Sequence, residues 1–120
     1  MSAWRPSSLP NRTLAMLICI IEFKVLPGME QRNREMVAQL LVAAAKIDGF
    51  VSKESFLSRD NEGKLISLSY WRDAEALRAW MRDADHRRAI PIGKNELFQS
   101  YTIQIAELVR EKVWTRQENK

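Results

Sequence analysis

Apolar residues run almost without interruption through residues 14–25, a segment rich in isoleucine that ends at the sequence Leu-Pro-Gly. Such a run predicts a central β-strand that is covered on both faces. Successive side chains of a strand point to opposite faces, so both faces of this strand would be apolar. The two sets are Leu17, Cys19 and Ile21 on one face, and Ile18 and Ile20 on the other.

The next segment, residues 29–47, has the period of an amphipathic helix. Gly49, in the Asp-Gly pair that follows, is expected to end this helix because glycine readily adopts a left-handed conformation. The apolar stripe consists of Val37, Leu40, Leu41, Ala44 and Ala45, and the polar side carries Gln31, Arg34, Glu35 and Gln39.

A hairpin and a second helix are predicted next. Residues 50–58 and 64–71 are β-rich runs separated by a polar turn with a glycine. Asp73 is expected to cap the helix that follows. The apolar stripe of that helix consists of Leu77, Trp80, Met81 and Ala84.

The chain then predicts a short, partly helical turn over residues 86–93 and a last alternating strand over residues 97–108. Pro91 lacks an amide donor and is expected to push Ile90 out of helical geometry. The element order is therefore β-α-β-β-α-β.

This order predicts an α+β, ferredoxin-like fold, in which right-handed crossovers place both helices on one face of an antiparallel sheet. The other face would be bare and apolar, and large apolar patches seldom stay exposed. We therefore predict a homodimer joined sheet to sheet. The expected boundaries are an N-terminal extension over residues 1–13, a domain over residues 14–109 and a C-terminal tail over residues 110–120.

Composition narrows the function classes. The 120 residues suffice for one domain, and no stretch is long and apolar enough for a membrane helix. The formal charge of +4 divides into +2 for residues 1–68 and +2 for residues 69–120, without the basic stripe that nucleic-acid binding requires. Cys19 is the single cysteine, which suits a reducing compartment, and we expect a cytoplasmic protein.

Several kinds of site are disfavoured by missing motifs. The four glycines form no dinucleotide-binding array, and a lone histidine without cysteine pairs argues against zinc. An RNA-recognition domain shares the element order, but the strand over residues 64–71 lacks its glycine-aromatic signature. No metal, flavin or nicotinamide cofactor is expected.

Residues 48–90 have the sequence DGFVSKESFLSRDNEGKLISLSYWRDAEALRAWMRDADHRRAI. This segment combines a hairpin, the sequence YWRD, a second tryptophan nine positions after the tryptophan of YWRD, and an HR pair. In these features the chain resembles the antibiotic biosynthesis monooxygenase family over residues 14–109. The resemblance implies a dimeric α+β barrel with a cavity in each subunit between the sheet and its helices. Some members oxidise aromatic polyketides without metal or flavin, a related branch degrades heme, and many have no known substrate.

Cofactor-free oxygenation requires a site that holds flat rings and steadies an anion, because the substrate is deprotonated before it passes an electron to oxygen. The candidate catalytic residues are His86, Trp71 and Arg72. The candidate substrate-binding residues are Trp71, Trp80, Tyr70 and Tyr101.

These residues also have structural interpretations. Trp80 lies on the apolar stripe of its helix and is typical of a core residue. Tyr70 and Trp71 point to opposite faces of their strand, so only one can face a given cavity, and we favour Trp71. His86 follows an aspartate at an expected helix start, where histidines often have only a structural role.

Heme binding is possible in this superfamily but disfavoured here. The heme-degrading branch is characterised by an asparagine on the first strand, a tryptophan on the second helix and a histidine four positions beyond that of His86. Trp80 fits the tryptophan, but residues 14–25 contain no asparagine and Ile90 occupies the histidine position. The sequence thus favours a monooxygenase acting on a small hydrophobic or aromatic substrate, and the alternative is a non-catalytic dimer that binds a small ligand.

Overall fold

The computed structural model describes residues 15–117. The predicted N-terminal extension, residues 1–13, lies outside the described residues. The elements of the described part are β1 (Leu17–Val25), α1 (Glu30–Ala44), β2 (Phe50–Leu57), β3 (Lys64–Trp71), α2 (Ala74–Arg82), α3 (Ala84–Ile92), a π-helical turn (Gly93–Leu97) and β4 (Phe98–Glu107).

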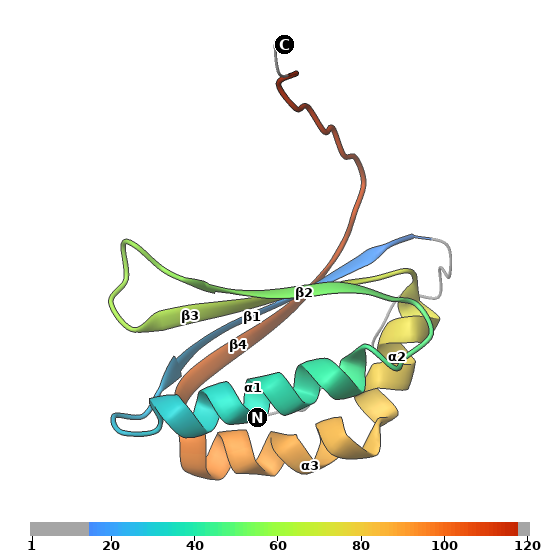
Figure 1. Cartoon of the computed structure of the whole chain (residues 1–120). Coiled ribbons are helices and arrows are strands. Elements are labelled where there is room, and N and C mark those ends of the chain that lie inside the picture. Colours follow the sequence, from blue (N-terminus) through green and yellow to red (C-terminus); the bar gives the residue numbers. More distant parts are fainter. Residues whose placement is uncertain (1–14, 118–120) are drawn as a thin grey trace.

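The strands form one antiparallel sheet in the order β2-β3-β1-β4. The three α-helices lie on one side of this sheet, and α1 and α3 run side by side (Figure 1). The α+β, ferredoxin-like fold predicted from the sequence is therefore confirmed. In the described part of the chain, the other side of the sheet carries no helix.

The register explains the near-continuous apolar run of β1. Leu17 pairs with Trp71 and Cys19 with Ser69 on the side that faces the helices. Ile18 pairs with Tyr70 on the opposite side. Both faces of β1 thus carry apolar side chains, as predicted, and in the described part of the chain helices cover one of these faces (Figure 1).

The core lies between the helix-facing side of the sheet and the helices. Leu17, Trp71 and Leu77 are almost completely buried. The small residues Ala44, Ala74 and Ala76 let the ends of α1 and α2 approach this cluster. The core is therefore concentrated at the end of the sheet where β1 begins and β3 ends.

The second helix ends earlier than predicted. Asp73 caps α2 by accepting a hydrogen bond from Ala76 N at 2.9 Å, as expected. Ala84, however, does not extend the stripe of α2, because Asp83 adopts an extended backbone and the chain restarts as α3. The side chain of Asp83 accepts hydrogen bonds from Asp85 N and His86 N, which favours a new helix over a continued one.

The prediction that Pro91 displaces Ile90 from helical geometry is wrong. Both residues lie inside α3, which extends to Ile92. Pro91 stands in the last turn of that helix, so only one helical hydrogen bond is lost. The chain then widens into the π-helical turn before β4.

Gly49 does not end the first helix. α1 ends at Ala44 with Ala45 still in a right-handed conformation. Gly49 has a φ of 96° and leads into β2, where its carbonyl accepts a hydrogen bond from Arg72 N at 2.7 Å. Its role is therefore to bring the start of β2 beside the end of β3.

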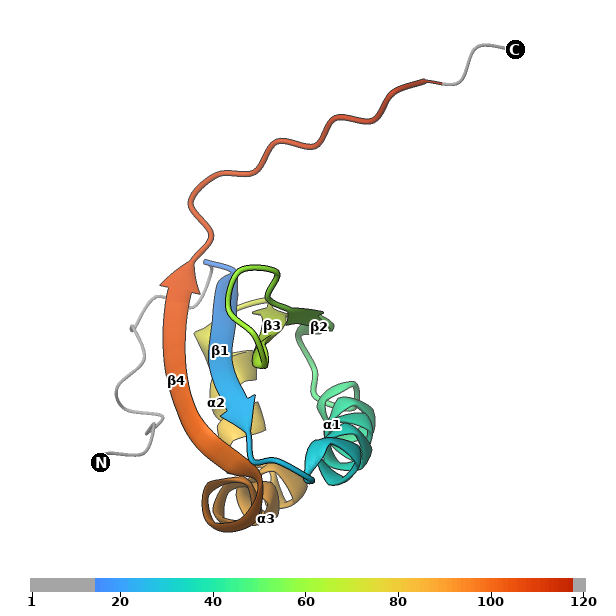
Figure 2. The same cartoon turned by 90° about the vertical axis from the view of Figure 1, so that its left-hand side faces the viewer.

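Residues 108–117 follow β4 as an extended segment that runs away from the rest of the fold (Figures 1 and 2). Val109, Val113 and Trp114 on this segment are exposed over 90%, 79% and 69% of their surface. The segment therefore carries apolar side chains that the described part of the chain does not cover.

Between residues 15 and 117, no helix has both the length and the apolar character needed to cross a membrane.

Candidate functional site

Four rings form a continuous stack through the interior, which we call the aromatic column: Phe50, Trp71, Trp80 and His86. Phe50 meets Trp71 edge-on at 5.3 Å between ring centroids. Trp71 stacks on Trp80 at 5.9 Å, and Trp80 stacks on His86 at 4.5 Å. The column joins β2, β3, α2 and α3, so it brings together residues that are up to 36 positions apart in the sequence.

Trp71 is held rigidly at the centre of this column. It is only 1% exposed, and its indole Nε1 donates a hydrogen bond to Ser69 Oγ at 3.0 Å. A buried indole N–H needs such an acceptor, because an unsatisfied donor is costly to bury. Trp71 is therefore a fixed wall of the interior, and Trp80 separates it from His86.

His86 lies in the first turn of α3 with its ring turned inward against Trp80. Burial lowers the pKa of His86 from 6.5 to about 4, and the positive charge of Lys53 acts in the same direction. The ring is therefore neutral at pH 7. Its Nδ1 atom is buried without a hydrogen-bond partner in the described part of the chain.

A row of side chains from all four strands crosses the helix-facing side of the sheet. The register places Lys53 opposite Ser69, Ser69 opposite Cys19, and Cys19 opposite Ile105. The β2 and β3 end of this row is polar and the β4 end is apolar. The next row repeats the pattern with Ser55, Ser67, Ile21 and Ile103.

Cys19 in this row is an unreactive thiol at neutral pH. Burial raises its pKa to about 11, against the opposing effects of a hydrogen bond with Ser69 and the charge of Lys53. Because the thiolate is the nucleophilic form, a thiol with this pKa contributes packing and a weak hydrogen-bond donor. We therefore assign Cys19 no nucleophilic role.

Asn33 is a second buried polar residue, on the inner side of α1. It is 5% exposed, and its Oδ1 atom has no hydrogen-bond partner within residues 15–117. Unpaired buried polar atoms are rare in native proteins, and each calls for an explanation such as a bound water or ligand. Asn33 Oδ1 and His86 Nδ1 are thus two buried polar atoms without a hydrogen-bond partner in the described part of the chain.

Several apolar side chains that face the interior are only partly buried. Ile21 and Ile103 face the helices from β1 and β4, and Leu40 faces the sheet from α1, yet all three are only partly buried. Residues that face a filled core would be inaccessible. Solvent therefore reaches part of the helix-facing side of the sheet.

The other sequence-predicted site residues lie elsewhere. Arg72 is exposed and forms ion pairs with Asp48 at 3.2 Å and Asp73 at 3.0 Å. Tyr70 lies on the side of the sheet that has no helices. Tyr101 faces the helices from β4, and its ring lies 6.1 Å from that of Phe98, away from the aromatic column.

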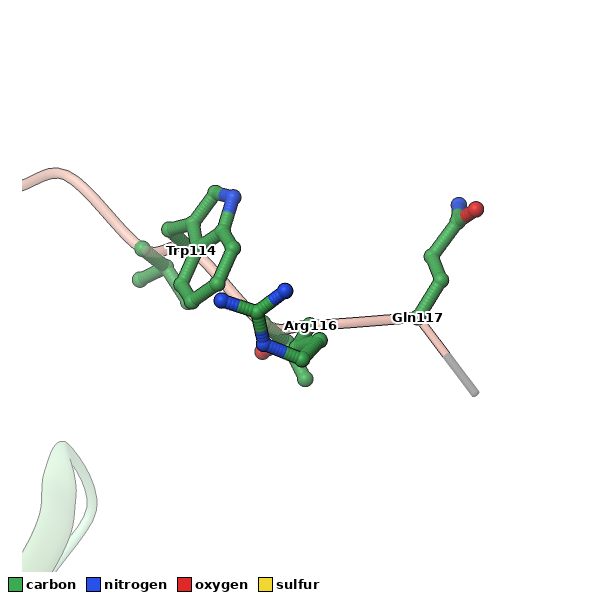
Figure 3. Close-up of a pocket in the computed structure, with 5 residues that line it drawn as sticks. Trp114, Arg116 and Gln117 are labelled. Carbon is green, nitrogen blue, oxygen red and sulfur yellow. The ribbon is translucent and has the colours of Figure 1, made fainter. Parts of the chain in front are cut away.

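Hollows on the surface of the described residues include two that lie outside the aromatic column. One of about 620 Å³ is lined by residues 113–117, where the Arg116 guanidinium lies 5.1 Å from the centroid of the Trp114 ring (Figure 3). All its lining residues belong to one extended stretch, so it has no second wall. The other, of about 200 Å³, lies beside the Lys64–Glu22 ion pair at the far end of the sheet.

Residues 15–117 contain no group of three or more histidine, cysteine, aspartate or glutamate side chains arranged to hold a metal ion.

The sequence of the chain matches a known family over the region that builds this site. Residues 16–91 match the family described as "Antibiotic biosynthesis monooxygenase", and this range contains the whole aromatic column. The chain belongs to the antibiotic biosynthesis monooxygenase family. The resemblance stated from the hairpin, the YWRD sequence and the HR pair is thereby confirmed.

Individual relatives are more distant. The chain is 27% identical over 93 residues to "Jasmonate monooxygenase ABM" of Pyricularia oryzae, a match that covers 78% of this chain and 43% of that protein. Among crystal structures, SnoaB, a cofactor-independent oxygenase from Streptomyces nogalater, has a TM-score of 0.71 at 14% identity and covers 81% of this chain and 96% of that one. Protein SO0527 from Shewanella oneidensis has a TM-score of 0.71 at 16% identity, with 79% and 92% covered. At these identities the structures establish the shared fold.

Two members of the interior were missed by the sequence reasoning. Asn33 stands at the polar end of a helical stripe that continues through Val37, Leu40 and Ala44, and a polar residue on such a stripe was the available signal. Lys53 gave no local signal. Its inward direction depends on a bulge between Phe50 and Ser52, which is visible only in the pairing of β2 with β3.

Proposed function

We propose that this protein is a cofactor-independent monooxygenase that binds a small hydrophobic or aromatic substrate between the sheet and its helices. The observation that carries the proposal is the neutral His86 ring, stacked on Trp80, whose buried Nδ1 atom has no partner. Membership of the monooxygenase family supports it, as do a relative named for jasmonate and a neighbour described as a cofactor-independent oxygenase.

The chemistry assigns different tasks to the residues of the column. Trp80 lies between the rings of Trp71 and His86, which cover its two faces, so its task is to hold the His86 ring in position. His86 Nδ1 accepts a proton or a hydrogen bond from the substrate. Because a histidine with a pKa of about 4 is a weak base, the substrate must itself carry an acidic C–H or O–H group.

The overall reaction needs no external reductant. An activated CH₂ group of the substrate and O₂ give a C=O group and water, so that the carbon loses four electrons and oxygen gains four. The proton that leaves the substrate is returned to the oxygen atom that departs as water. Arg72 and Tyr70 take no part in this scheme, since they lie outside the interior.

We further propose that the protein acts as a homodimer, joined through the side of the sheet that carries no helices. The dimeric α+β barrel, with a substrate cavity in each subunit, remains a proposal. The single buried cysteine is in keeping with a reducing, cytoplasmic compartment.

Oxygen uptake tests the activity directly. Purified protein, treated with a chelator and dialysed, would be mixed with a panel of anthrone-like phenols in an oxygen-electrode cell. We expect uptake by the wild type and a loss of about a hundredfold or more in His86→Phe, which preserves the ring stack but removes the acceptor nitrogen. Arg87→Ala, an exposed neighbour on α3, is the matched control and should keep wild-type activity.

Two outcomes would count against the enzyme. Unchanged uptake in His86→Phe would remove the assigned role of this residue. Saturable binding of the phenols without oxygen consumption would favour the alternative function, a dimer that binds a small ligand and performs no chemistry.

A further inference from the structure

The polar end of the helix-facing side of the sheet carries one positively charged side chain, Lys53. Lys53 lies on β2 opposite Ser69, on the same side of the sheet as Cys19, and it is half-buried. Its charge lowers the pKa of His86 and opposes the rise in the pKa of Cys19. Lys53 therefore belongs to the same inward-facing row as Ser69 and Cys19.

Lys53 has no counter-charge within the described residues. Among the described residues, no ion pair joins Lys53 to a carboxylate, and only Cys19 has a coulombic effect on the pKa of Lys53. Glu54, its neighbour in sequence, pairs with Leu68 and points to the opposite side of the sheet. A partly buried cation without a carboxylate partner is costly unless something else supplies the negative charge.

An inward-pointing lysine on an edge strand can also serve only to prevent edge-to-edge aggregation. Such a lysine keeps its ammonium group in water. At Lys53, burial lowers the pKa below its usual value of 10.5, so the group is substantially desolvated. Lys53 therefore differs from such a lysine, because its side chain is half-buried on the inner side of the sheet.

The rest of the two rows completes an amphipathic wall. Hydroxyl groups of Ser67 and Ser69 flank the Lys53 end, whereas the partly accessible side chains of Ile21, Ile103 and Ile105 form the opposite end. A molecule that matched this wall would have an apolar body and one negatively charged oxygen group.

We propose that the interior binds an amphipathic organic anion, with its carboxylate, enolate or phenolate oxygen paired to Lys53 and its apolar body against Ile21, Ile103 and Ile105. This inference deepens the proposed function, because it concerns the ligand of the same site. It assigns Lys53 to substrate binding and makes the negative charge a determinant of specificity.

Matched pairs of probes test the proposal by isothermal titration calorimetry at pH 8. 1-Naphthaleneacetate is compared with the neutral 1-naphthaleneacetamide, and ionised 4-nitrophenol with the neutral 4-nitroanisole. We expect the wild type to bind at least one anion about tenfold or more tightly than its neutral counterpart, as charge-assisted hydrogen bonds to a partly buried group commonly achieve. The preferred pair distinguishes a carboxylate from a phenolate.

Lys53→Gln should bind the anion and its neutral counterpart equally, whereas Lys53→Arg should retain the preference. Lys94→Gln, which removes an exposed lysine from the turn before β4, is the matched control for net charge and should behave as the wild type. If Lys53→Gln unfolds, two measurements still test the proposal. They are the preference of the wild type for the anion over its neutral counterpart, and the same preference in Lys53→Arg.

An anion preference that survives in Lys53→Gln, equal binding of both members of each pair, or no saturable binding of any probe would overturn the proposal. Oxygen uptake is recorded separately. If the anion binds in a Lys53-dependent way but no oxygen is consumed, the monooxygenase is refuted and this inference stands. If oxygen uptake is unchanged in Lys53→Gln and equal for neutral substrates, this inference is refuted and the monooxygenase stands.

Discussion

Single residues in the interior acquire their chemical character from what surrounds them. His86 is an ordinary histidine in the sequence, but burial against Trp80 and the nearby charge of Lys53 make it neutral with an unpaired Nδ1 atom. Cys19 is reactive in principle, but burial keeps it protonated. The same local environment therefore disfavours the charged form of both residues, the imidazolium of His86 and the thiolate of Cys19.

The low pKa of His86 makes the stability of the protein depend on pH. The unfolded chain binds a proton below about pH 6.5, but the folded protein binds it only near pH 4, so stability is lost as the pH falls through this window. The difference amounts to about 3 kcal/mol between pH 7 and pH 4. Between pH 7 and pH 4, the free energy of unfolding of His86→Phe, measured with urea, should fall by about 3 kcal/mol less than that of the wild type.

The same prediction can be checked without a mutation. His86 is the only histidine in the chain, so the imidazole C–H resonances in an NMR titration belong to it alone. We expect these resonances to shift near pH 4. A midpoint near 6.5 would show that the ring is solvated and would contradict the assignment.

At the level of the elements, the site depends on two short connections more than on the helices themselves. The turn around Gly49 places Phe50 against Trp71, and the extended backbone of Asp83 turns His86 back towards Trp80. The first connection leads into β2, which carries Phe50, and the second leads into α3, which carries His86. Their geometry therefore determines whether the four rings meet.

Gly49 tests this dependence. A Cβ atom at this position would lie 2.5 Å from Ala76 Cβ, and the φ of +96° is itself unfavourable for alanine. Gly28 has a similar φ of +86°, but a Cβ there meets nothing within 4 Å. Gly28→Ala should therefore cost only about 1 kcal/mol from the backbone, whereas Gly49→Ala should cost about 2 kcal/mol more. Thermal or urea unfolding measures both.

The matched pair separates backbone strain from steric overlap. Equal destabilisation by the two substitutions would mean that α2 can shift away from the turn at little cost, and that the junction of β2, β3 and α2 is less tightly packed than the structure indicates.

The element boundaries were also where the sequence reasoning failed. The stripe through Leu77, Trp80 and Met81 predicted one helix up to Ala84. Ala84 keeps the helical spacing of this stripe, so the spacing does not reveal that the helix ends before it. The break arises from the side chain of Asp83, which satisfies two backbone amides at the start of α3. Pro91 was expected to disrupt a helix, yet it is accommodated in the last turn.

For the whole molecule, the main uncovered apolar surface of the described residues is the side of the sheet without helices. Phe56 there is 43% exposed, and Ile18, Ile20 and Leu68 are only partly buried. The C-terminal segment adds the exposed Val113 and Trp114. Together these surfaces motivate the proposed homodimer.

Sedimentation tests the dimer. We expect a species of about 28 kDa, twice the chain mass of 14.0 kDa, at micromolar concentration. Ile20→Asp, in the middle of the bare face, should shift the population towards the monomer while the circular dichroism spectrum stays native. Gln39→Glu, on the exposed side of α1, adds the same charge and is the control. A wild-type monomer under these conditions would remove the proposal.

The sequence by itself determined the order of the four strands and the first two helices, the fold and the family, because period-two and helical patterns are local properties of consecutive residues. It also placed Trp80 on the second helix and Trp71 and His86 on either side of that helix. Only the tertiary structure decided that these rings stack on one another, that Lys53 points inward, and that Asn33 and His86 are buried without partners. Those features depend on strand register, on one bulge and on the packing of helices against the sheet, which join residues that are distant in the sequence.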